Sequence, residues 1–340
     1  MSNRRSLVTG GGGFIGSHLV RQLQENGDIV RILELPEVAL PANVEIVRGS
    51  ICDPHAVRKA LKGVHRLYHL AANPNLWARK KSDFNRVNYE GTRVIFAEAA
   101  KQELEVIVYT STESIMTGNV HQHESVSSVM ECYLNKMPGP YCRSKYLAEL
   151  EALKAAHEGM PVVVVAPTLP VGPGDRSSTP PTRMILDFLN TKTPAYLDCG
   201  FNMADVRDIA RGHILAAEHG KAGERYILGN ENMTLSQLLA WLEEITGLAM
   251  PKRQIPYWLA FMTGAVSEFV ADYVTHTPPM APLTGVRLAR HPMYFDCSKA
   301  VTELGLPRHS VRQAIADEIE WLLDRGLVMR RLPLLREISD

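Results

Sequence analysis

A tyrosine and a lysine lie four residues apart in the run Tyr141-Cys142-Arg143-Ser144-Lys145, at the start of a predicted helix. Residues four apart share one face of a helix, so the phenol and the ammonium group are expected to lie close together. A nearby positive charge favours the phenolate and lowers the pKa of a tyrosine. Such a phenol can give or take the proton of an alcohol or carbonyl during hydride transfer. The pair therefore predicts a general acid and base at Tyr141, assisted by Lys145.

A hydroxyl group at the end of a buried strand would complete this catalytic set. Residues 106–111 form an apolar run that predicts such a strand, and Thr110, Ser111 and Thr112 stand at its end. Counting from the end of the strand places the catalytic hydroxyl at Thr112, with Ser111 as the alternative.

A glycine-rich turn near the start of the chain could hold the hydride carrier. Gly10, Gly13 and Gly16 recur every third residue between an apolar strand and an amphipathic helix. The first glycine allows a sharp turn, the second lets a pyrophosphate approach the backbone, and the third lets helix and strand pack closely. Phosphates would then lie at the helix N-terminus, where free N–H groups and the helix dipole favour anions.

The acid at the end of the second predicted strand indicates which dinucleotide, NAD or NADP, the chain binds. Glu34 stands where a carboxylate accepts hydrogen bonds from the adenosine ribose hydroxyls. It would repel a 2′-phosphate, and the nearest arginine, Arg31, lies inside the strand. The cofactor is therefore expected to be NAD, with NADP less favoured.

Alternating strands and helices must position these motifs in the first half of the chain. Alternation of this kind predicts an α/β fold, a Rossmann-type doubly wound parallel sheet with helices on both faces. Ligands on such a sheet gather at the carboxyl ends of its strands. We expect strands at 6–9, 29–34, 44–48, 66–71, 106–111 and 162–166, and helices at 17–25, 54–61, 88–101 and 145–157.

The pattern becomes irregular after Pro167 and predicts a smaller C-terminal substrate lobe. A proline-rich loop is expected at 167–182, one strand at 225–228, and helices at 182–190, 206–219, 235–246 and 311–325. We expect a dinucleotide-binding domain over 1–170, to which 205–228 returns, and a substrate-binding lobe over 171–204 and 229–340.

Two later segments bear on contacts with lipids. The nearly apolar stretch 257–274 is expected to be an ordinary buried helix, and the alternative is that its start, 257–262, lines an apolar pocket. It lacks the basic polar face of a membrane-surface helix. The tail 325–336 mixes basic and apolar residues and is the better candidate for contact with a membrane surface or a partner.

The composition argues against several other classes of protein. Lys and Arg together number 37, as do Asp and Glu, so nucleic-acid binding is not expected. No run reaches the ~18 apolar residues of a membrane-spanning helix. Five scattered cysteines, and a start that reads at once as strand, predict reduced thiols in a cytoplasmic protein. No metal site is expected, since the His-rich patch 121–124 lies in polar loop sequence.

The order of these motifs resembles the extended short-chain dehydrogenase/reductases, also described as the NAD-dependent epimerase/dehydratase family. The resemblance extends over nearly the whole chain. Besides the motifs above it rests on Ala71-Ala72-Asn73, Asn88-x-x-Gly91-Thr92, Gly172-Pro173-Gly174-Asp175, Val206-x-Asp208 and Phe295-Asp296-x-Ser298-Lys299-Ala300.

The resemblance implies a role for each site residue. Tyr141 would be the general acid and base, Lys145 would hold the nicotinamide ribose, and Thr112 would bind the reacting oxygen. Where the family often has an Asp that touches adenine, this chain has Ser50. The cofactor-binding residues implied are Gly10, Gly13, Phe14, Ile15, Gly16, Glu34, Ser50, Ile51, Leu70, Ala71, Ala72, Asn88, Tyr141, Lys145 and Pro167.

Two substrate classes remain open within the family. Nucleotide-sugar epimerases and dehydratases grip a pyrophosphate with arginines, but Phe201 stands where the first is expected, and there is no late Arg-x-Gly-Asp. Arg287 and Arg290 are then the arginines left to meet a phosphate. The nucleotide-sugar enzyme is therefore kept as the alternative.

The favoured class is a lipophilic substrate. Residues 212–218 and 293–300 resemble 3β-hydroxysteroid and sterol-4-carboxylate 3-dehydrogenases, and 161–198 resembles hopanoid-associated sugar epimerases, a group near the dihydroflavonol reductases. We expect an NAD-dependent enzyme that oxidises or reduces a secondary alcohol or ketone on a sterol- or hopanoid-like molecule. Decarboxylation of a 4-carboxysterol is one form of this reaction. The family also implies a homodimer.

Overall fold

A seven-stranded parallel sheet forms the centre of the computed structural model, which describes residues 4–116, 134–191 and 195–334. The strand order is β10-β6-β5-β4-β1-β2-β3. The chain therefore adds strands outward from β1 on one side and from β4 on the other, and the order of the strands reverses between these two. This is the predicted Rossmann-type fold. The strands are β1 (Arg5–Thr9), β2 (Ile29–Glu34), β3 (Glu45–Arg48), β4 (Arg66–His69), β5 (Val106–Thr110), β6 (Val162–Pro167) and β10 (Arg225–Leu228).

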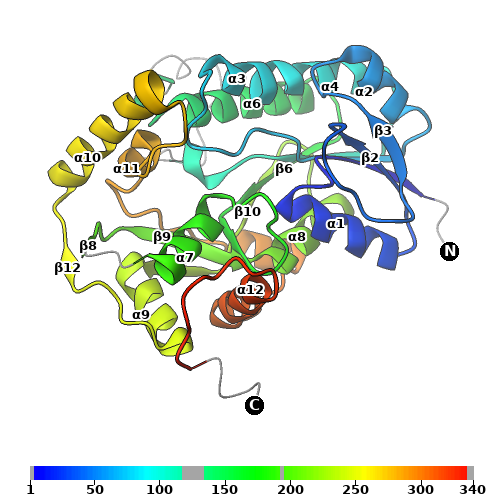
Figure 1. The fold of residues 1–340 in the computed structure, drawn as a ribbon. Coiled ribbons are helices and arrows are strands. Elements are labelled where there is room, and N and C mark those ends of the chain that lie inside the picture. Colours follow the sequence, from blue (N-terminus) through cyan, green and yellow to red (C-terminus); the bar gives the residue numbers. More distant parts are fainter. Residues whose placement is uncertain (1–3, 117–133, 192–194, 335–340) are drawn as a thin grey trace.

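Helices cover both faces of this sheet (Figure 1). One face carries α2 (Pro54–Leu61), α4 (Gly91–Ala99) and α6 (Pro140–His157), and the other carries α1 (Phe14–Glu25) and α8 (Val206–His219). Because both faces are covered, every residue of β6 is buried, which explains its uninterrupted apolar sequence.

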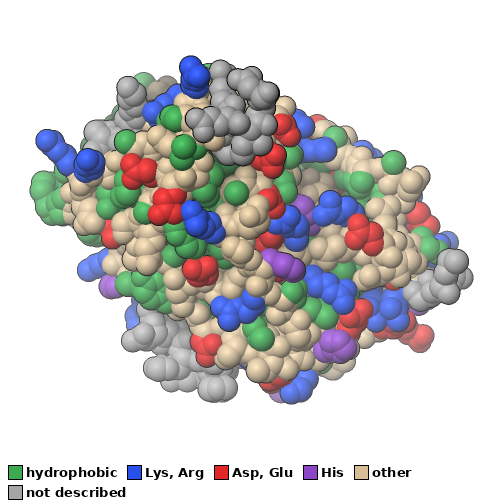
Figure 2. All heavy atoms as spheres, turned by 90° about the horizontal axis from the view of Figure 1, so that it is seen from below, with side chains coloured by type: hydrophobic (Ala, Val, Ile, Leu, Met, Phe, Trp, Pro, Cys, Tyr) green, Lys and Arg blue, Asp and Glu red, His purple; other side chains and the backbone are tan. Residues whose placement is uncertain are grey.

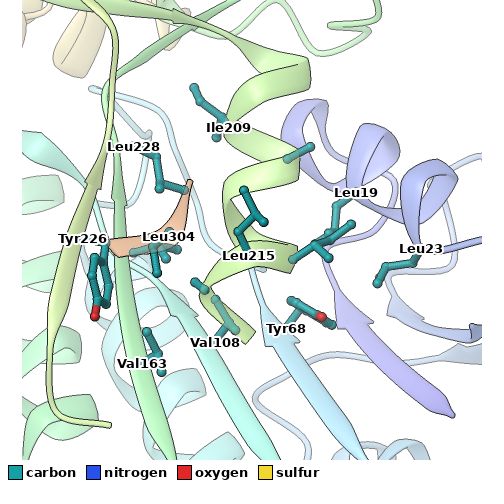
Figure 3. Close-up of a cluster of buried hydrophobic side chains, with 14 of the residues drawn as sticks. Leu19, Leu23, Tyr68, Val108, Val163, Ile209, Leu215, Tyr226, Leu228 and Leu304 are labelled. Carbon is teal, nitrogen blue, oxygen red and sulfur yellow. The ribbon is translucent and has the colours of Figure 1, made fainter. Parts of the chain in front are cut away.

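Apolar side chains from α1 and α8 fill the space against one face of the sheet (Figure 3). Leu19 of α1 and Leu215 of α8 are buried in one cluster with Tyr68 of β4 and Val108 of β5. Tyr226 of β10 belongs to the same cluster. The segment after the irregular loop thus returns to complete this face of the central sheet.

A second lobe lies beside the carboxyl edge of the sheet and has its own core. Its three-stranded sheet has the order β11-β9-β7, and a further pair joins β8 to β12. Met203, Leu238 and Ile315 lie in its buried cluster. Its elements are β7 (Leu169–Val171), α7 (Pro180–Asn190), β8 (Ala195–Tyr196), β9 (Gly200–Asp205), β11 (Glu231–Thr234), α9 (Leu235–Thr246), β12 (Arg253–Gln254) and α12 (Val311–Asp324).

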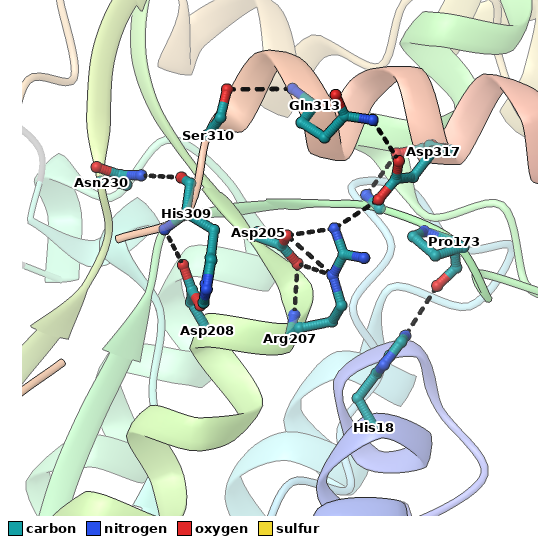
Figure 4. A network of polar contacts seen from close by, with 12 residues as sticks. His18, Pro173, Asp205, Arg207, Asp208, Asn230, His309, Ser310, Gln313 and Asp317 are labelled. Atoms are coloured by element: carbon teal, nitrogen blue, oxygen red, sulfur yellow. Dashed lines mark hydrogen bonds and ion pairs between the residues drawn. The ribbon is translucent and has the colours of Figure 1, made fainter. Parts of the chain in front are cut away.

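Polar contacts fasten this lobe to the central sheet and its helices (Figure 4). Arg207 in the first turn of α8 donates to Asp205 at the end of β9, and its guanidinium lies 2.7 Å from a carboxylate oxygen of Asp317 in α12. His18 of α1 bonds through Nε2 to the carbonyl of Pro173 at 2.8 Å. The loop 172–175 is therefore held against the helix that follows the glycine turn.

The predicted burial of the stretch 257–274 is wrong. The stretch forms α10 (Tyr257–Val270), continued by a π-helical turn, η3 (Ala271–Thr275), but only Ala260 and Gly264 of α10 are buried. One side of α10 packs against α11 (Leu283–Leu288), and the other side faces solvent. No helix in the described part of the chain is long and apolar enough to cross a membrane.

Candidate active site

The glycine turn has the close contacts that its spacing predicts. Gly10 has φ +73°, and a Cβ atom there would lie 2.9 Å from the Cα atom of Ala71. A Cβ atom on Gly16 would overlap the carbonyl oxygen of Gly10. In contrast, the only atom close to a Cβ atom on Gly13 would be the Gly10 oxygen, at 3.2 Å. The turn is therefore tight at Gly10 and Gly16 and open at Gly13.

The N-terminus of α1 is available to an anion. Gly13 is its N-cap residue, so no side chain caps the helix, and its first turn holds no acidic residue. The N–H groups of Phe14 and Ile15 begin this turn, where the helix dipole is positive. An open backbone at Gly13 and free N–H groups beyond it fit a dinucleotide pyrophosphate.

Glu34 lies beside this turn at the end of β2. Its Oε2 atom accepts a hydrogen bond from the Gly12 N–H at 3.0 Å, and Oε1 accepts one from the Leu35 N–H at 3.1 Å. On the neighbouring strand end, the Ser50 hydroxyl accepts a hydrogen bond from the Cys52 N–H at 3.1 Å. Ile51 packs against Gly91. The predicted adenosine residues thus gather at adjacent strand ends.

A buried histidine, which the sequence did not single out, orders the end of β4. His69 bonds through Nδ1 to the Thr9 hydroxyl at 2.8 Å and through Nε2 to the Thr92 hydroxyl at 3.0 Å. The Thr9 hydroxyl accepts a hydrogen bond from the Ala71 N–H. Burial, with a smaller effect of the Lys145 charge, lowers the pKa of His69 to about 3, so the ring is neutral. The network holds Leu70 and Ala71 against the glycine turn.

Asn88 connects this strand end to the helix that carries the tyrosine. It is buried in a π-helical segment, η1 (Asn85–Glu90), that precedes α4. Its Oδ1 atom accepts from the Asn73 N–H at 2.7 Å, and its Nδ2 atom donates to the Ser144 hydroxyl at 3.0 Å. The Ser144 hydroxyl in turn donates to the carbonyl of Tyr141. Asn88 therefore fixes the first turn of α6.

Lys145 points into the protein beneath the end of β5. Its ammonium group donates to the carbonyl of Thr110 at 2.7 Å and lies 5.0 Å from the centre of the Tyr109 ring. Burial lowers the pKa of Lys145 to about 8, although the charge of Glu149 acts in the opposite direction. The lysine therefore keeps most of its charge at neutral pH.

Tyr141 and Thr112 are brought together, but the tyrosine titrates differently from our expectation. A hydrogen bond with the Thr112 side chain lowers the pKa of Tyr141, yet burial has the larger effect and raises it. The charge of Glu113 raises it further, and Lys145 is not among the groups that act on it. The expected lowering of the pKa of Tyr141 by Lys145 is therefore not found, and the Lys145 ammonium group donates to the Thr110 carbonyl.

Glu113, the residue after Thr112, is a buried acid that was not among the predicted site residues. It begins a short 3₁₀ turn, η2 (Glu113–Ile115). Its carboxylate accepts hydrogen bonds from the hydroxyls of Thr112, at 3.1 Å, and Ser114, at 3.2 Å. Burial raises the pKa of Glu113 to about 7. The hydroxyl of Ser111 is buried with no hydrogen-bond partner among the described residues, and Thr112 is the residue that meets Tyr141.

Tyr141 also has apolar neighbours around its ring. Its ring meets the edge of Phe84 with centroids 6.3 Å apart, and it packs against a buried cluster of Ile115, Met137 and Cys142. Leu288 of α11 packs against the same cluster.

The three positions considered for binding the pyrophosphate of a nucleotide sugar, Arg287, Arg290 and Phe201, make other contacts in the structure. Arg287 donates to the carbonyl of Pro138 at 3.1 Å, and Arg290 lies over the ring of Tyr257. Phe201 is buried in the core of the second lobe. The His-rich patch 121–124 lies outside the described residues. Within those residues there is no group of three His, Cys, Asp or Glu side chains that could hold a metal ion.

Comparison with known proteins gives one family and several relatives. A model of the NAD-dependent epimerase/dehydratase family matches residues 6–229. A protein of Synechocystis sp., provisionally named dihydroflavonol 4-reductase, is 41% identical over 95% of both chains. Sterol demethylase protein B of Methylococcus capsulatus is 32% identical over 95% of this chain and 99% of its own. The decarboxylating sterol-4-alpha-carboxylate 3-dehydrogenase of Mus musculus is 28% identical over 87% of this chain and 84% of its own.

Solved structures share the fold. The crystal structure of gox2253 is 34% identical in sequence, with a TM-score of 0.82 over 96% of this chain and all of its own. The UDP-glucose 4-epimerase of Thermus thermophilus, solved with NAD, has a TM-score of 0.72 over 94% of this chain and 99% of its own. At 21% identity that second likeness is one of fold alone.

Proposed function

Because the chain belongs to the NAD-dependent epimerase/dehydratase family, we propose that it is an NAD-dependent oxidoreductase for a lipophilic alcohol or ketone. The substrate is a secondary alcohol or ketone on a sterol- or hopanoid-like molecule. The observation that carries this proposal is the group of apolar side chains packed around Tyr141, among them Phe84, Met137 and Leu288. Contact with apolar side chains of this kind would stabilise a large apolar substrate.

The cofactor site is assigned to the residues around the glycine turn. Backbone N–H groups of Phe14 and Ile15 would hold the pyrophosphate, and the carboxylate of Glu34 would accept from the adenosine ribose. NAD, when bound, supplies the hydride acceptor. The carboxylate disfavours NADP, since a 2′-phosphate would lie against a negative charge.

The catalytic roles are assigned to three side chains. In oxidation, the hydrogen on the carbinol carbon leaves as a hydride with its electron pair, and the Tyr141 phenolate takes the hydroxyl proton, which leaves a ketone. Thr112 holds the reacting oxygen, and Lys145 holds the ribose. Since burial raises the pKa of Tyr141, its phenol must first lose a proton, and oxidation is expected to be faster at higher pH.

Two further features complete the proposal. Where the carbon next to the oxidised position carries a carboxylate, the product is a β-keto acid that loses CO₂ readily. This fits the relative named as a decarboxylating sterol-4-alpha-carboxylate 3-dehydrogenase. Residues 1–170 and 205–228 would hold the cofactor, and 171–204 and 229–340 the substrate. A homodimer paired through α4 and α6 is part of the same proposal.

A nucleotide-sugar epimerase or dehydratase is the second candidate, because solved relatives of that kind share the fold. The oxidoreductase and the epimerase differ in the products that accumulate. With a 3β-hydroxysteroid or its 4-carboxylate and NAD, we expect NADH absorbance and ketone in equal amounts. With a UDP-sugar we expect no conversion. Conversion of the UDP-sugar without net NADH, and no reaction with the steroids, would replace the first candidate by the second.

Replacing Glu34 tests the choice of cofactor. Glu34→Gln keeps an oxygen that can accept from the Gly12 N–H but removes the charge, so the glycine turn should persist. We expect the Kd for NAD to rise about tenfold, because hydrogen bonds to charged groups contribute about 1.5–3 kcal/mol, and the preference over NADP to fall. The exposed Glu37 on the following turn provides the control, and Glu37→Gln should leave both affinities unchanged. An unchanged preference in Glu34→Gln would mean that Glu34 does not face the ribose.

A further inference from the structure

The outward side of α10 and η3 is a continuous apolar strip without a charge. Trp258, Met262, Val266, Phe269 and Tyr273 recur at helical spacing, and each is more than half exposed, up to 72% for Tyr273. Among the described residues they form the longest such series on one helix. The nearby hydroxyl of Thr263 is satisfied within the helix, since it donates to the carbonyl of Leu259 at 2.8 Å. The main hydrogen-bonding groups of the strip are therefore the indole N–H of Trp258 and the hydroxyl of Tyr273, near its two ends.

The two acids of this segment are turned inward and share one lysine. Glu268 lies 3.0 Å and Asp272 3.2 Å from the ammonium group of Lys81. Asp272 also accepts a hydrogen bond from the indole N–H of Trp77 at 2.6 Å, and Glu268 accepts one from the Leu283 N–H. The helix is thus fixed to the protein through its polar side, which leaves the apolar side free of negative charge.

Basic side chains flank the strip at its N-terminal end. Lys252 and Arg253 are exposed in the segment that leads into α10, and Arg290 stacks on Tyr257 in its first turn. Figure 2 shows hydrophobic side chains gathered at the end of the molecule where α10 begins in Figure 1, with basic side chains beside them.

We propose that this strip docks on the surface of an anionic lipid bilayer, with Trp258 and Tyr273 at headgroup level and the residues between them in the acyl region. Segments that bind the surface of a bilayer have apolar area, aromatic rings at the interface and nearby Lys or Arg side chains, and the strip with its flanking residues has all three. A protein–protein interface carries about one hydrogen bond per 100–200 Å², whereas the hydrogen-bonding groups of the strip are confined to Trp258 and Tyr273 near its two ends.

The absence of a basic polar face on the helix, which counted against membrane contact in the sequence, is explained by the fold. An isolated interfacial helix needs a polar face toward water, but α10 has the protein body on that side instead. Its Glu268 and Asp272 meet Lys81 there. The docking strip is therefore α10 and η3 rather than the tail 325–336. This inference goes beyond the proposed function, and a lipophilic substrate would enter from the same bilayer.

Flotation of the full chain with vesicles tests this inference without any measurement of turnover. On vesicles of phosphatidylcholine and phosphatidylglycerol in about a 2:1 ratio, we expect the protein to float and its tryptophan emission to shift to the blue. Trp258→Ser/Phe269→Ser should abolish flotation, because both side chains are over 60% exposed and removing them leaves the fold intact. Lys252→Ala/Arg253→Ala should weaken binding to these vesicles and not to pure phosphatidylcholine.

A matched variant separates the strip from the tail. Met329 is 85% exposed in the tail, and Met329→Ser should float as the unaltered protein does. Flotation lost in Met329→Ser and retained in Trp258→Ser/Phe269→Ser would overturn the assignment in favour of the tail. Failure of the unaltered protein to float would overturn it outright. So would a dimer in ultracentrifugation that Trp258→Ser/Phe269→Ser dissociates, together with no flotation, since the strip would then face a second copy.

Discussion

Tyr141→Phe is expected to lower kcat by about 100- to 10,000-fold, the range that a positioned acid and base contributes. The phenylalanine ring keeps the edge-to-face contact with Phe84 and the packing against Met137, so the apolar surround should be unchanged. What disappears is the oxygen that bonds to Thr112 and that we propose as the acid and base. NAD affinity, measured by fluorescence titration, should change by less than about threefold.

Tyr146 provides the control for this prediction, since it is a tyrosine of the same helix that packs against the same cluster. Tyr146→Phe should keep most of the activity. If Tyr141→Phe retained activity within a few-fold of the unaltered enzyme, the acid and base would have to be another group, and Glu113 would be the first to examine.

A pair of glycine substitutions should separate cofactor binding from folding. At Gly13 the backbone is extended, with φ −74°, and a Cβ atom meets only the Gly10 oxygen at 3.2 Å. Gly13→Ala should therefore fold normally but weaken NAD binding about 10- to 100-fold, because the methyl group occupies the space of the pyrophosphate. Gly16→Ala should lose NAD binding and also about 1–3 kcal/mol of unfolding free energy, because its Cβ atom overlaps the Gly10 carbonyl.

Chemical denaturation and NAD titration of both variants measure the two effects. Gly27→Ala is the control, since Gly27 follows the same helix and a Cβ atom there meets no other atom within 4 Å. Its φ of +84° should lead to a modest loss of stability and unchanged NAD binding. NAD binding that survived in Gly13→Ala would contradict the assignment of the pyrophosphate to this turn.

The central sheet could be predicted because its strands are covered on both faces. Runs such as Val162–Pro167 are buried at every residue, so they stand out as uninterrupted apolar sequence. The second lobe was harder to predict. The strand β9 contains Asn202, which is buried there only because Asn230 and Asn232 from a distant segment satisfy its amide. The strand β7 lies within proline-rich sequence that predicts only a loop.

Some features of the site could likewise be predicted from local spacing in the sequence, whereas others depend on tertiary contacts. Tyr141 and Lys145 share a helix, and Thr112 follows a strand end, so spacing alone predicted their neighbourhood. The burial of Glu113 beside Thr112 depends on what packs over the turn, and an acid after a hydroxyl run was the only signal for it. The exposure of α10 could not be foreseen either, because an apolar sequence does not reveal whether another element covers it.

The most direct test of the central claim follows deuterium from the substrate in the steroid assay. A 3β-hydroxysteroid with deuterium on the carbinol carbon is incubated with the enzyme and NAD, and the reduced cofactor and the steroid are analysed by mass spectrometry. We predict one deuterium atom in each NADH formed, with ketone in equal amount, and neither product with Tyr141→Phe. NADH without deuterium, or a steroid returned unchanged while a UDP-sugar is converted, would contradict the account.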